Sequence, residues 1–138
     1  MKNISKLLLS LECVKFSPLS PYTYASGLKG PIYCDNRKLL GYPAARTEII
    51  NALKIGLPAI STFDILGGLA TAGIPWAAIM ADHLSLPMIY IRGKAKEHGA
   101  KNQIEGNFIS GQKVLLIEDL INQGSSMAEA IAVCQKSG

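Results

Sequence analysis

The chain has 138 residues, of which 49% are hydrophobic, 7% aromatic and 17% charged, with a formal net charge of +4. This length is typical of one domain with a sizeable core, and the composition favours a well-covered α/β domain over a disordered chain. Four of the basic residues lie within residues 92–101, at Arg92, Lys94, Lys96 and Lys101. Such a local excess favours a small-anion site over a nucleic-acid surface, which needs a broader basic face.

Residues 2–12 predict an amphipathic helix, because Ile4, Leu7, Leu8 and Leu11 recur on one side. Its apolar run is too short for a signal peptide core or a membrane span, so we expect no membrane partner.

The three cysteines, Cys13, Cys34 and Cys134, form no CxxC pair. They predict free thiols in a reducing cytoplasm.

Strands and helices alternate along the rest of the chain. Strands are expected at 22–25 and 32–34, followed by a helix at 44–55 that ends at Gly56 and a strand at 63–66 that ends in Gly67–Gly68. A second helix is expected to begin near Pro75 and to bury Trp76, Ile79, Met80 and Leu84. Strands at 88–91 and 114–117 and a final helix complete the expected elements. Residues 92–110 are polar and weakly periodic. This alternation predicts an α/β fold with a parallel sheet, whose ligands bind beyond the strand C-termini. We therefore expect Gly67–Gly68, Arg92 and Glu118–Asp119 to converge on one crevice.

The segment 114–126 is the most informative of the chain. Four apolar residues predict a buried strand, which ends on Glu118 and Asp119. A loop with Gly124 then leads into a predicted helix, and Ser126 and Glu129 match a capping box at its start. The inner face of this helix is expected to hold Met127, Ala130, Ile131 and Cys134. Free N–H groups at such a helix start bind phosphate, and the carboxylates suit the hydroxyls of a ribose. The alternative is an ordinary strand–turn–helix.

These residues resemble the phosphoribosyl pyrophosphate (PRPP) motif of type I phosphoribosyltransferases. The resemblance implies that Glu118 and Asp119 hold the ribose hydroxyls, with Asp119 catalytic. It further implies that the PRPP phosphate is bound by Leu120, Ile121, Asn122, Gln123, Gly124, Ser125 and Ser126.

The stretch from Tyr24 to Arg37 is similar to the signature of the orotate phosphoribosyltransferases. This resemblance implies a hood over the base, in which Tyr33, Cys34 and Lys29 contact orotate together with Asn122. The family commonly has threonine at position 122, and asparagine can still donate a hydrogen bond. The alternative is a purely structural β-hairpin.

Two further segments resemble loops of that family. Residues 67–75 are similar to its pyrophosphate loop, which implies PRPP contacts at Thr71 and Ala72, although a lysine found there in some members is missing. Residues 92–99 are similar to its mobile catalytic loop, which implies that Arg92, Lys96 and His98 bind PRPP and that Lys96 and His98 act in catalysis. A solvated charged loop is the alternative.

The resemblance implies a type I phosphoribosyltransferase-like parallel sheet flanked by helices, with an N-terminal helix and hood over about 1–42 and a core over about 43–138. The implied reaction is phosphoribosyl transfer from PRPP to orotate. Mg²⁺ is expected to be held mainly through PRPP without a dedicated protein ligand, and the protein is expected to be a homodimer without a nucleic-acid partner.

Two other functions stay open, a phosphoribosyltransferase for another base and a non-catalytic PRPP-binding regulator. Family chains usually continue further, with an arginine for the orotate carboxylate, so this chain is expected to be a fragment or a truncated form.

Overall fold

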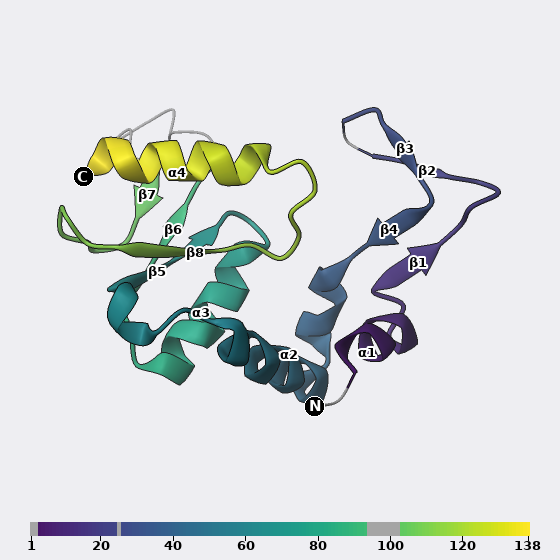
Figure 1. The fold of residues 1–138 in the computed structure, drawn as a ribbon, viewed down its shortest axis with the longest axis horizontal. Coiled ribbons are helices and arrows are strands. Elements are labelled where there is room, and N and C mark those ends of the chain that lie inside the picture. The colour runs from purple at the N-terminus through teal and green to yellow at the C-terminus, as the bar shows by residue number, and fades with distance from the viewer. Residues whose placement is uncertain (1–2, 25, 94–102) are drawn as a thin grey trace. The chain divides into compact units, whose positions relative to one another are not determined.

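The computed structural model describes residues 3–24, 26–93 and 103–138, which form two compact units, Met1–Ile55 and Gly56–Gly138 (Figure 1). The first unit begins with α1 (Ile4–Ser10), where the Asn3 side chain accepts a hydrogen bond from the Lys6 N–H at 3.2 Å. Such a cap satisfies one of the free N–H groups at a helix start. The predicted helix is confirmed with narrower bounds.

Two short antiparallel ribbons follow in the first unit. Strand β1 (Val14–Phe16) pairs with β4 (Ile32–Cys34), and β2 (Tyr22–Thr23) pairs with β3 (Lys29–Gly30) across a turn that contains Gly27 at φ +81°. The strands predicted at 22–25 and 32–34 correspond to β2 and β4, whereas β1 and β3 were not predicted.

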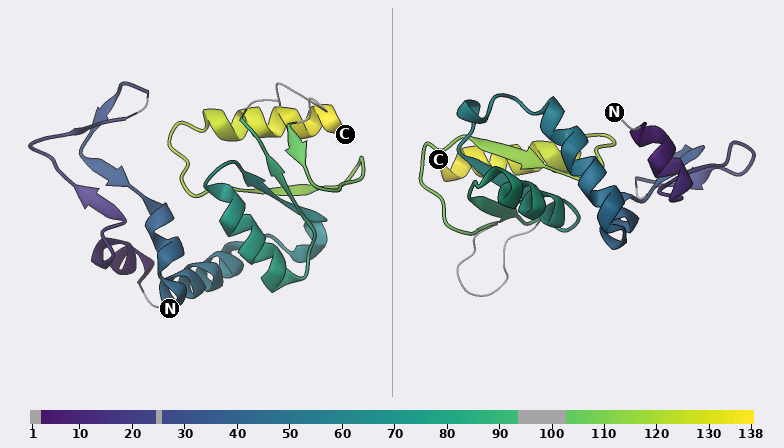
Figure 2. Two further views of the ribbon diagram at one scale, coloured as in Figure 1. Left: turned by 180° about the vertical axis from the view of Figure 1, so that it is seen from behind. Right: turned by 90° about the horizontal axis from the view of Figure 1, so that it is seen from below.

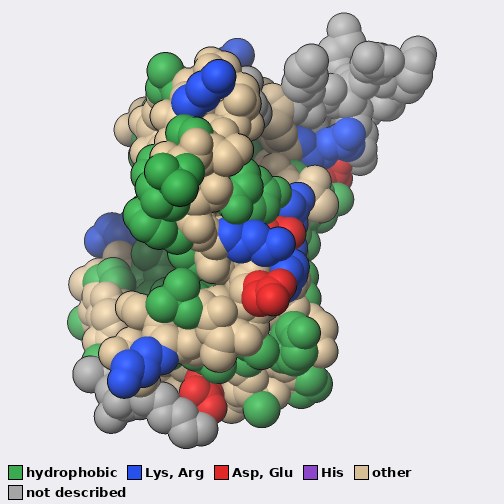
Figure 3. Space-filling model, turned by 90° about the vertical axis from the view of Figure 1, so that its right-hand side faces the viewer, with side chains coloured by type: hydrophobic (Ala, Val, Ile, Leu, Met, Phe, Trp, Pro, Cys, Tyr) green, Lys and Arg blue, Asp and Glu red, His purple; other side chains and the backbone are tan. Residues whose placement is uncertain are grey.

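Several apolar side chains of these ribbons and their turns are exposed, namely Phe16, Leu19, Leu28, Ile32 and Tyr33. Figure 3 shows one face of the molecule, on which exposed apolar side chains lie beside lysine and arginine side chains.

A 3₁₀ helix, η1 (Asn36–Gly41), and the helix α2 (Pro43–Gly56) follow β4. Leu39, Ala45 and Ile50 are buried along them. Proline is favoured in the first turn of a helix, which is consistent with the start at Pro43. The helix predicted at 44–55 is confirmed.

The second unit is built on a four-stranded sheet with the order β7-β6-β5-β8 (Figures 1 and 2). Strands β5 (Ile65–Leu69), β6 (Met88–Ile91) and β8 (Val114–Ile117) are parallel, and β7 (Ile104–Glu105) is antiparallel to β6. The predicted parallel sheet is confirmed for three strands. The fourth was missed, and it makes the sheet mixed.

Strand β5 corrects the prediction at 63–66. It starts at Ile65 and continues through Gly67 and Gly68 to Leu69, with all five residues buried. The glycines allow close packing: a Cβ on Gly67 would meet side chains of β6 and β8, and one on Gly68 would meet the backbone of Ile74 at 2.9 Å. The prediction that 114–117 is a buried strand is also corrected, because β8 is an outermost strand of the sheet and is only half-buried.

Helices cover both faces of this sheet (Figure 2). Helix α3 (Gly73–Leu84) packs against β5, β6 and β8 and buries Trp76 and Met80 as predicted, whereas Ile79 and Leu84 are only half-buried. It starts two residues before Pro75. The short 3₁₀ helix η2 (Ile60–Thr62) precedes β5.

Helix α4 (Ser125–Ser137) covers the other face, where Ile65, Leu69, Ile89, Ile91 and Ile104 form the core with Ala130. Met127 and Cys134 pack against this core as predicted. Ile131 does not, since 44% of it is exposed, and Val133 packs there instead. None of the helices in the described ranges has the length and apolar character needed to cross a membrane.

Candidate functional site: the C-terminal edge of the sheet

The C-terminal ends of the three parallel strands meet at one edge of the sheet. Leu69 pairs with Ile91, and Gly68 pairs with Ile117. The Ala70 N–H also donates a hydrogen bond to the Ile91 carbonyl at 2.8 Å. The residues that follow β5, β6 and β8, Arg92 and Glu118 among them, therefore emerge at this end of the sheet, whereas Gly67 and Gly68, which were expected with them, lie inside β5.

A small cavity of about 80 Å³ lies at this edge. It is lined by Leu69 and Ala70 after β5, by Ile91, Arg92 and Gly93 after β6, by Gln103, and by Ser126, Glu129, Ala130 and Val133 of α4. It brings together the ends of two strands and the first three turns of α4. The acidic pair after β8 is not part of its lining.

Residues 70–73 connect β5 to α3. Thr71 is exposed and Ala72 is half-buried, and the peptide bond between Ala70 and Thr71 is cis. Gly73 touches the end of β8, because a Cβ added there would meet the carbonyl oxygen of Ile117 and lie 3.3 Å from the Cα atom of Glu118. The start of α3 thus lies directly beside the acidic pair.

Glu118 and Asp119 are both half-buried, and the Asp119 N–H donates a 2.9 Å hydrogen bond to Glu118 Oε1. Burial raises the pKa of Glu118 from its ordinary value of 4.5 to about 7. The side chain of Asp119 adds to the rise, whereas the hydrogen bond from its N–H opposes it. Adjacent carboxylates of this kind can accept hydrogen bonds from hydroxyl groups or meet a cation.

This raised pKa predicts a pH-dependent stability. The folded protein holds the Glu118 proton more tightly than the unfolded chain between pH 4.5 and about 7, so this group makes the free energy of unfolding fall as pH rises through that window. Glu118→Gln should flatten the decline, as measured by urea unfolding at several pH values. Equal slopes for both proteins across the window would contradict the assignment.

The loop from Leu120 to Gly124 leads into α4. Gly124 occupies the N-cap position at φ +80°, and its carbonyl accepts the Ala128 N–H at 2.9 Å. The predicted capping box is therefore wrong, because Ser126 lies inside the helix and no side chain caps it. Helix geometry leaves the N–H groups of Ser125 and Ser126 without a partner in the helix, so they can donate to an anion.

Arg92, the first residue after β6, is held at the edge by β7. Its N–H donates to the Gln103 carbonyl at 2.8 Å, and its Nη1 lies 3.5 Å from Glu105 Oε1. Glu105 was not predicted as a partner of Arg92, because β7 was not expected. Lys96 and His98, the other basic residues predicted for this site, lie outside the described residues.

The residues predicted to contact orotate divide between the units. Lys29 is exposed on β3, Tyr33 and Cys34 lie on β4, and Asn122 is exposed in the loop before α4. The ring of Tyr33 lies 5.4 Å from that of Tyr22, centroid to centroid, at an interplanar angle of 36°.

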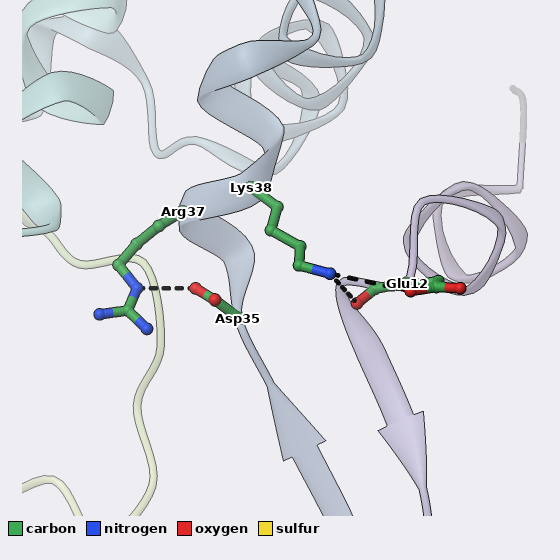
Figure 4. Close-up of polar contacts among 4 residues, drawn as sticks. All are labelled: Glu12, Asp35, Arg37 and Lys38. Atoms are coloured by element: carbon green, nitrogen blue, oxygen red, sulfur yellow. Dashed lines mark hydrogen bonds and ion pairs between the residues drawn. The ribbon is translucent and has the colours of Figure 1, made fainter.

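Charged residues at the ends of the β1–β4 ribbon are paired (Figure 4). Arg37 Nε donates to Asp35 Oδ1 at 2.7 Å, and this hydrogen bond holds the pKa of Asp35 below its usual value. Lys38 Nζ donates to the Glu12 carbonyl at 3.3 Å.

A larger cavity of about 330 Å³ lies between α4 and the segment before β8. Its lining includes Phe108, Ile109, Leu116, Ile131 and Cys134. None of the predicted site residues lines it, so it is not part of the candidate site.

Comparison with known proteins decides the family. The model of the phosphoribosyl transferase domain matches residues 54–138. The chain belongs to the phosphoribosyl transferase domain family. The match includes the whole edge described above, from β5 to α4.

Individual relatives narrow the resemblance of this phosphoribosyl transferase. It is 50% identical over 138 residues to the orotate phosphoribosyltransferase of Enterococcus faecalis, covering 99% of this chain and 66% of that protein. The chain therefore spans slightly less than two thirds of that relative's length. The resemblance to orotate phosphoribosyltransferases, which was inferred from residues 24–37 and from the PRPP motif, is confirmed.

Solved structures confirm the fold. The orotate phosphoribosyltransferase of Aeropyrum pernix matches with a TM-score of 0.80 and 29% identity, over 99% of this chain and 75% of that one. Leishmania donovani UMP synthase matches with a TM-score of 0.78 and 31% identity, over 98% of this chain and 28% of that one. The predicted type I phosphoribosyltransferase fold is confirmed.

Proposed function

We propose that the chain forms most of the PRPP and orotate site of an orotate phosphoribosyltransferase, which makes orotidine 5′-phosphate and pyrophosphate for pyrimidine synthesis. The observation that supports this most is the 50% identity to an orotate phosphoribosyltransferase across 99% of the chain. The sheet edge adds support, because it combines adjacent carboxylates with a helix N-terminus.

In this proposal Glu118 and Asp119 bind the 2′- and 3′-hydroxyls of the ribose. The bond to pyrophosphate breaks largely before the new bond forms, and positive charge develops on the sugar. Carboxylates at this position favour that charge, because electrostatic stabilisation is strongest where charge develops. The raised pKa of Glu118 would return toward its ordinary value beside a cation.

The 5′-phosphate and the pyrophosphate group of PRPP are proposed to bind to two different sets of residues. Backbone N–H groups from Leu120 to Ser126 bind the 5′-phosphate at the positive end of α4. Thr71, Ala72 and Arg92 bind the pyrophosphate group, joined by Lys96 and His98, which are proposed to act on the leaving group.

Orotate is proposed to contact Tyr33, Cys34, Lys29 and Asn122. An aromatic ring offers a stacking surface to the flat base, and the Lys29 ammonium complements its carboxylate. Arg37, another cation of the same unit, is already paired with Asp35. We therefore favour Lys29.

Mg²⁺ fits this edge chemically, because it prefers oxygen ligands and keeps several of its waters. The described residues contain no group of three or more His, Cys, Asp or Glu side chains that could hold a metal ion. Glu118 and Asp119 are the carboxylates that would face a Mg²⁺ ion bound through PRPP, which when present neutralises phosphate charge. We further propose a homodimer in the cytoplasm.

A base-selection assay tests the substrate. With PRPP and Mg²⁺ fixed, the protein is expected to consume PRPP with orotate and not with hypoxanthine, adenine or uracil. Turnover of another base with orotate inert would favour a different phosphoribosyltransferase. PRPP binding without turnover of any base would favour a regulator.

A further inference from the structure

The short strand β7 places an acidic residue beside the arginine at the end of β6. Arg92 Nη1 lies 3.5 Å from Glu105 Oε1, and the side chains are 37% and 22% exposed. The significance of this pair for catalysis rests on the proposed function, in which Arg92 binds the pyrophosphate group.

The register of β6 and β7 explains why the two side chains meet. Tyr90 pairs with Glu105 and Ile91 pairs with Ile104, so Arg92 lies one step beyond the ladder. Because side chains alternate along a strand, Arg92 shares a face with Tyr90 and Glu105. Arg92 and Glu105 are then diagonal neighbours across the pair, a separation that long side chains can span.

The backbone of Arg92 is fixed as well. Its N–H donates to the Gln103 carbonyl at 2.8 Å, and its own carbonyl accepts a 3.3 Å hydrogen bond from Gln103 Nε2. Arg92 and Gln103 also both line the small cavity at the sheet edge. The backbone of Arg92 is thus held by Gln103, and its guanidinium contacts Glu105 through Nη1.

We propose that Glu105 is a positioning residue that orients the Arg92 guanidinium toward the pyrophosphate group of PRPP. A guanidinium presents five donors in a planar fork. The contact with Glu105 uses Nη1, which leaves donors on Nε and Nη2 for phosphate oxygens. A fixed fork loses less rotational freedom on binding than a free side chain does.

A double-mutant cycle on Mg-PRPP binding, measured by calorimetry, tests this role. Glu105→Gln is expected to weaken binding about fivefold, the upper range for a partly exposed ion pair. In an Arg92→Ala background the same substitution should have no further effect. Glu105→Asp, which keeps the charge, should recover part of the loss, and the Michaelis constant for orotate should stay unchanged.

The control is Asp82→Asn, which removes one exposed carboxylate of α3 from the same unit. An equal loss in this variant, or an equal effect of Glu105→Gln with and without Arg92, would overturn the positioning role. If the wild-type protein binds Mg-PRPP but never uses orotate, the proposed function is refuted. The role of Glu105 can still be tested in that case, because the double-mutant cycle measures only PRPP binding. No PRPP binding by the wild type would overturn both.

Discussion

Asp119→Asn is expected to weaken Mg-PRPP binding about ten- to hundredfold while leaving the fold intact. The substitution removes a charge-assisted hydrogen bond to a ribose hydroxyl, which contributes about 1.5–3 kcal/mol. Asp119 lies at the end of β8 and is half-buried, and its backbone N–H still reaches Glu118 in the variant. Calorimetry with PRPP and Mg²⁺ gives the affinity, and circular dichroism gives the fold.

Asp64→Asn is the matched control, because it lies before β5 at the opposite edge of the sheet. Asp64 Oδ2 accepts the Lys113 N–H at 2.7 Å and so ties the starts of β5 and β8 together. This variant should unfold at lower urea concentration and bind PRPP normally. Unchanged affinity in Asp119→Asn would refute the ribose assignment.

Gly73→Ala is expected to lower both stability and PRPP affinity. The new methyl group would press on the Ile117 carbonyl, a backbone atom of β8 that cannot move without shifting Glu118. Overpacking of this kind costs about 1–3 kcal/mol of the free energy of unfolding. Urea unfolding and PRPP calorimetry measure the two effects.

Gly41→Ala is the corresponding control, since a Cβ at Gly41 meets nothing within 4 Å. It should leave both quantities nearly unchanged. A Gly73→Ala protein as stable as the wild type would show that α3 and β8 have room between them, contrary to the packing described above.

The longer helices and the apolar strands were predictable from periodicity, as α2, α3, β6 and β8 show. The errors came from residues whose local preference is outweighed by packing. Gly67 and Gly68 read as a strand end, yet they lie inside β5 because neighbouring elements leave no space for a side chain. Ser126 and Glu129 match a capping box, yet Gly124 takes the N-cap position.

The candidate site was predictable only where its residues are neighbours in the sequence. The acidic pair, the glycine loop and the helix start are contiguous in sequence, so their proximity follows from local structure alone. Glu105 was missed because its approach to Arg92 depends on the register between β6 and β7, which no local pattern encodes. The raised pKa of Glu118 depends on burial, which also requires the folded sheet.

The most direct measurement is the synthesis of orotidine 5′-phosphate from orotate, PRPP and Mg²⁺. It should be made on a polypeptide extended to the length of the Enterococcus faecalis relative, because the chain spans 66% of that protein. We expect rapid synthesis by this extended protein and its loss in Asp119→Asn. An extended, folded protein that binds PRPP but makes no orotidine 5′-phosphate would contradict the proposed function.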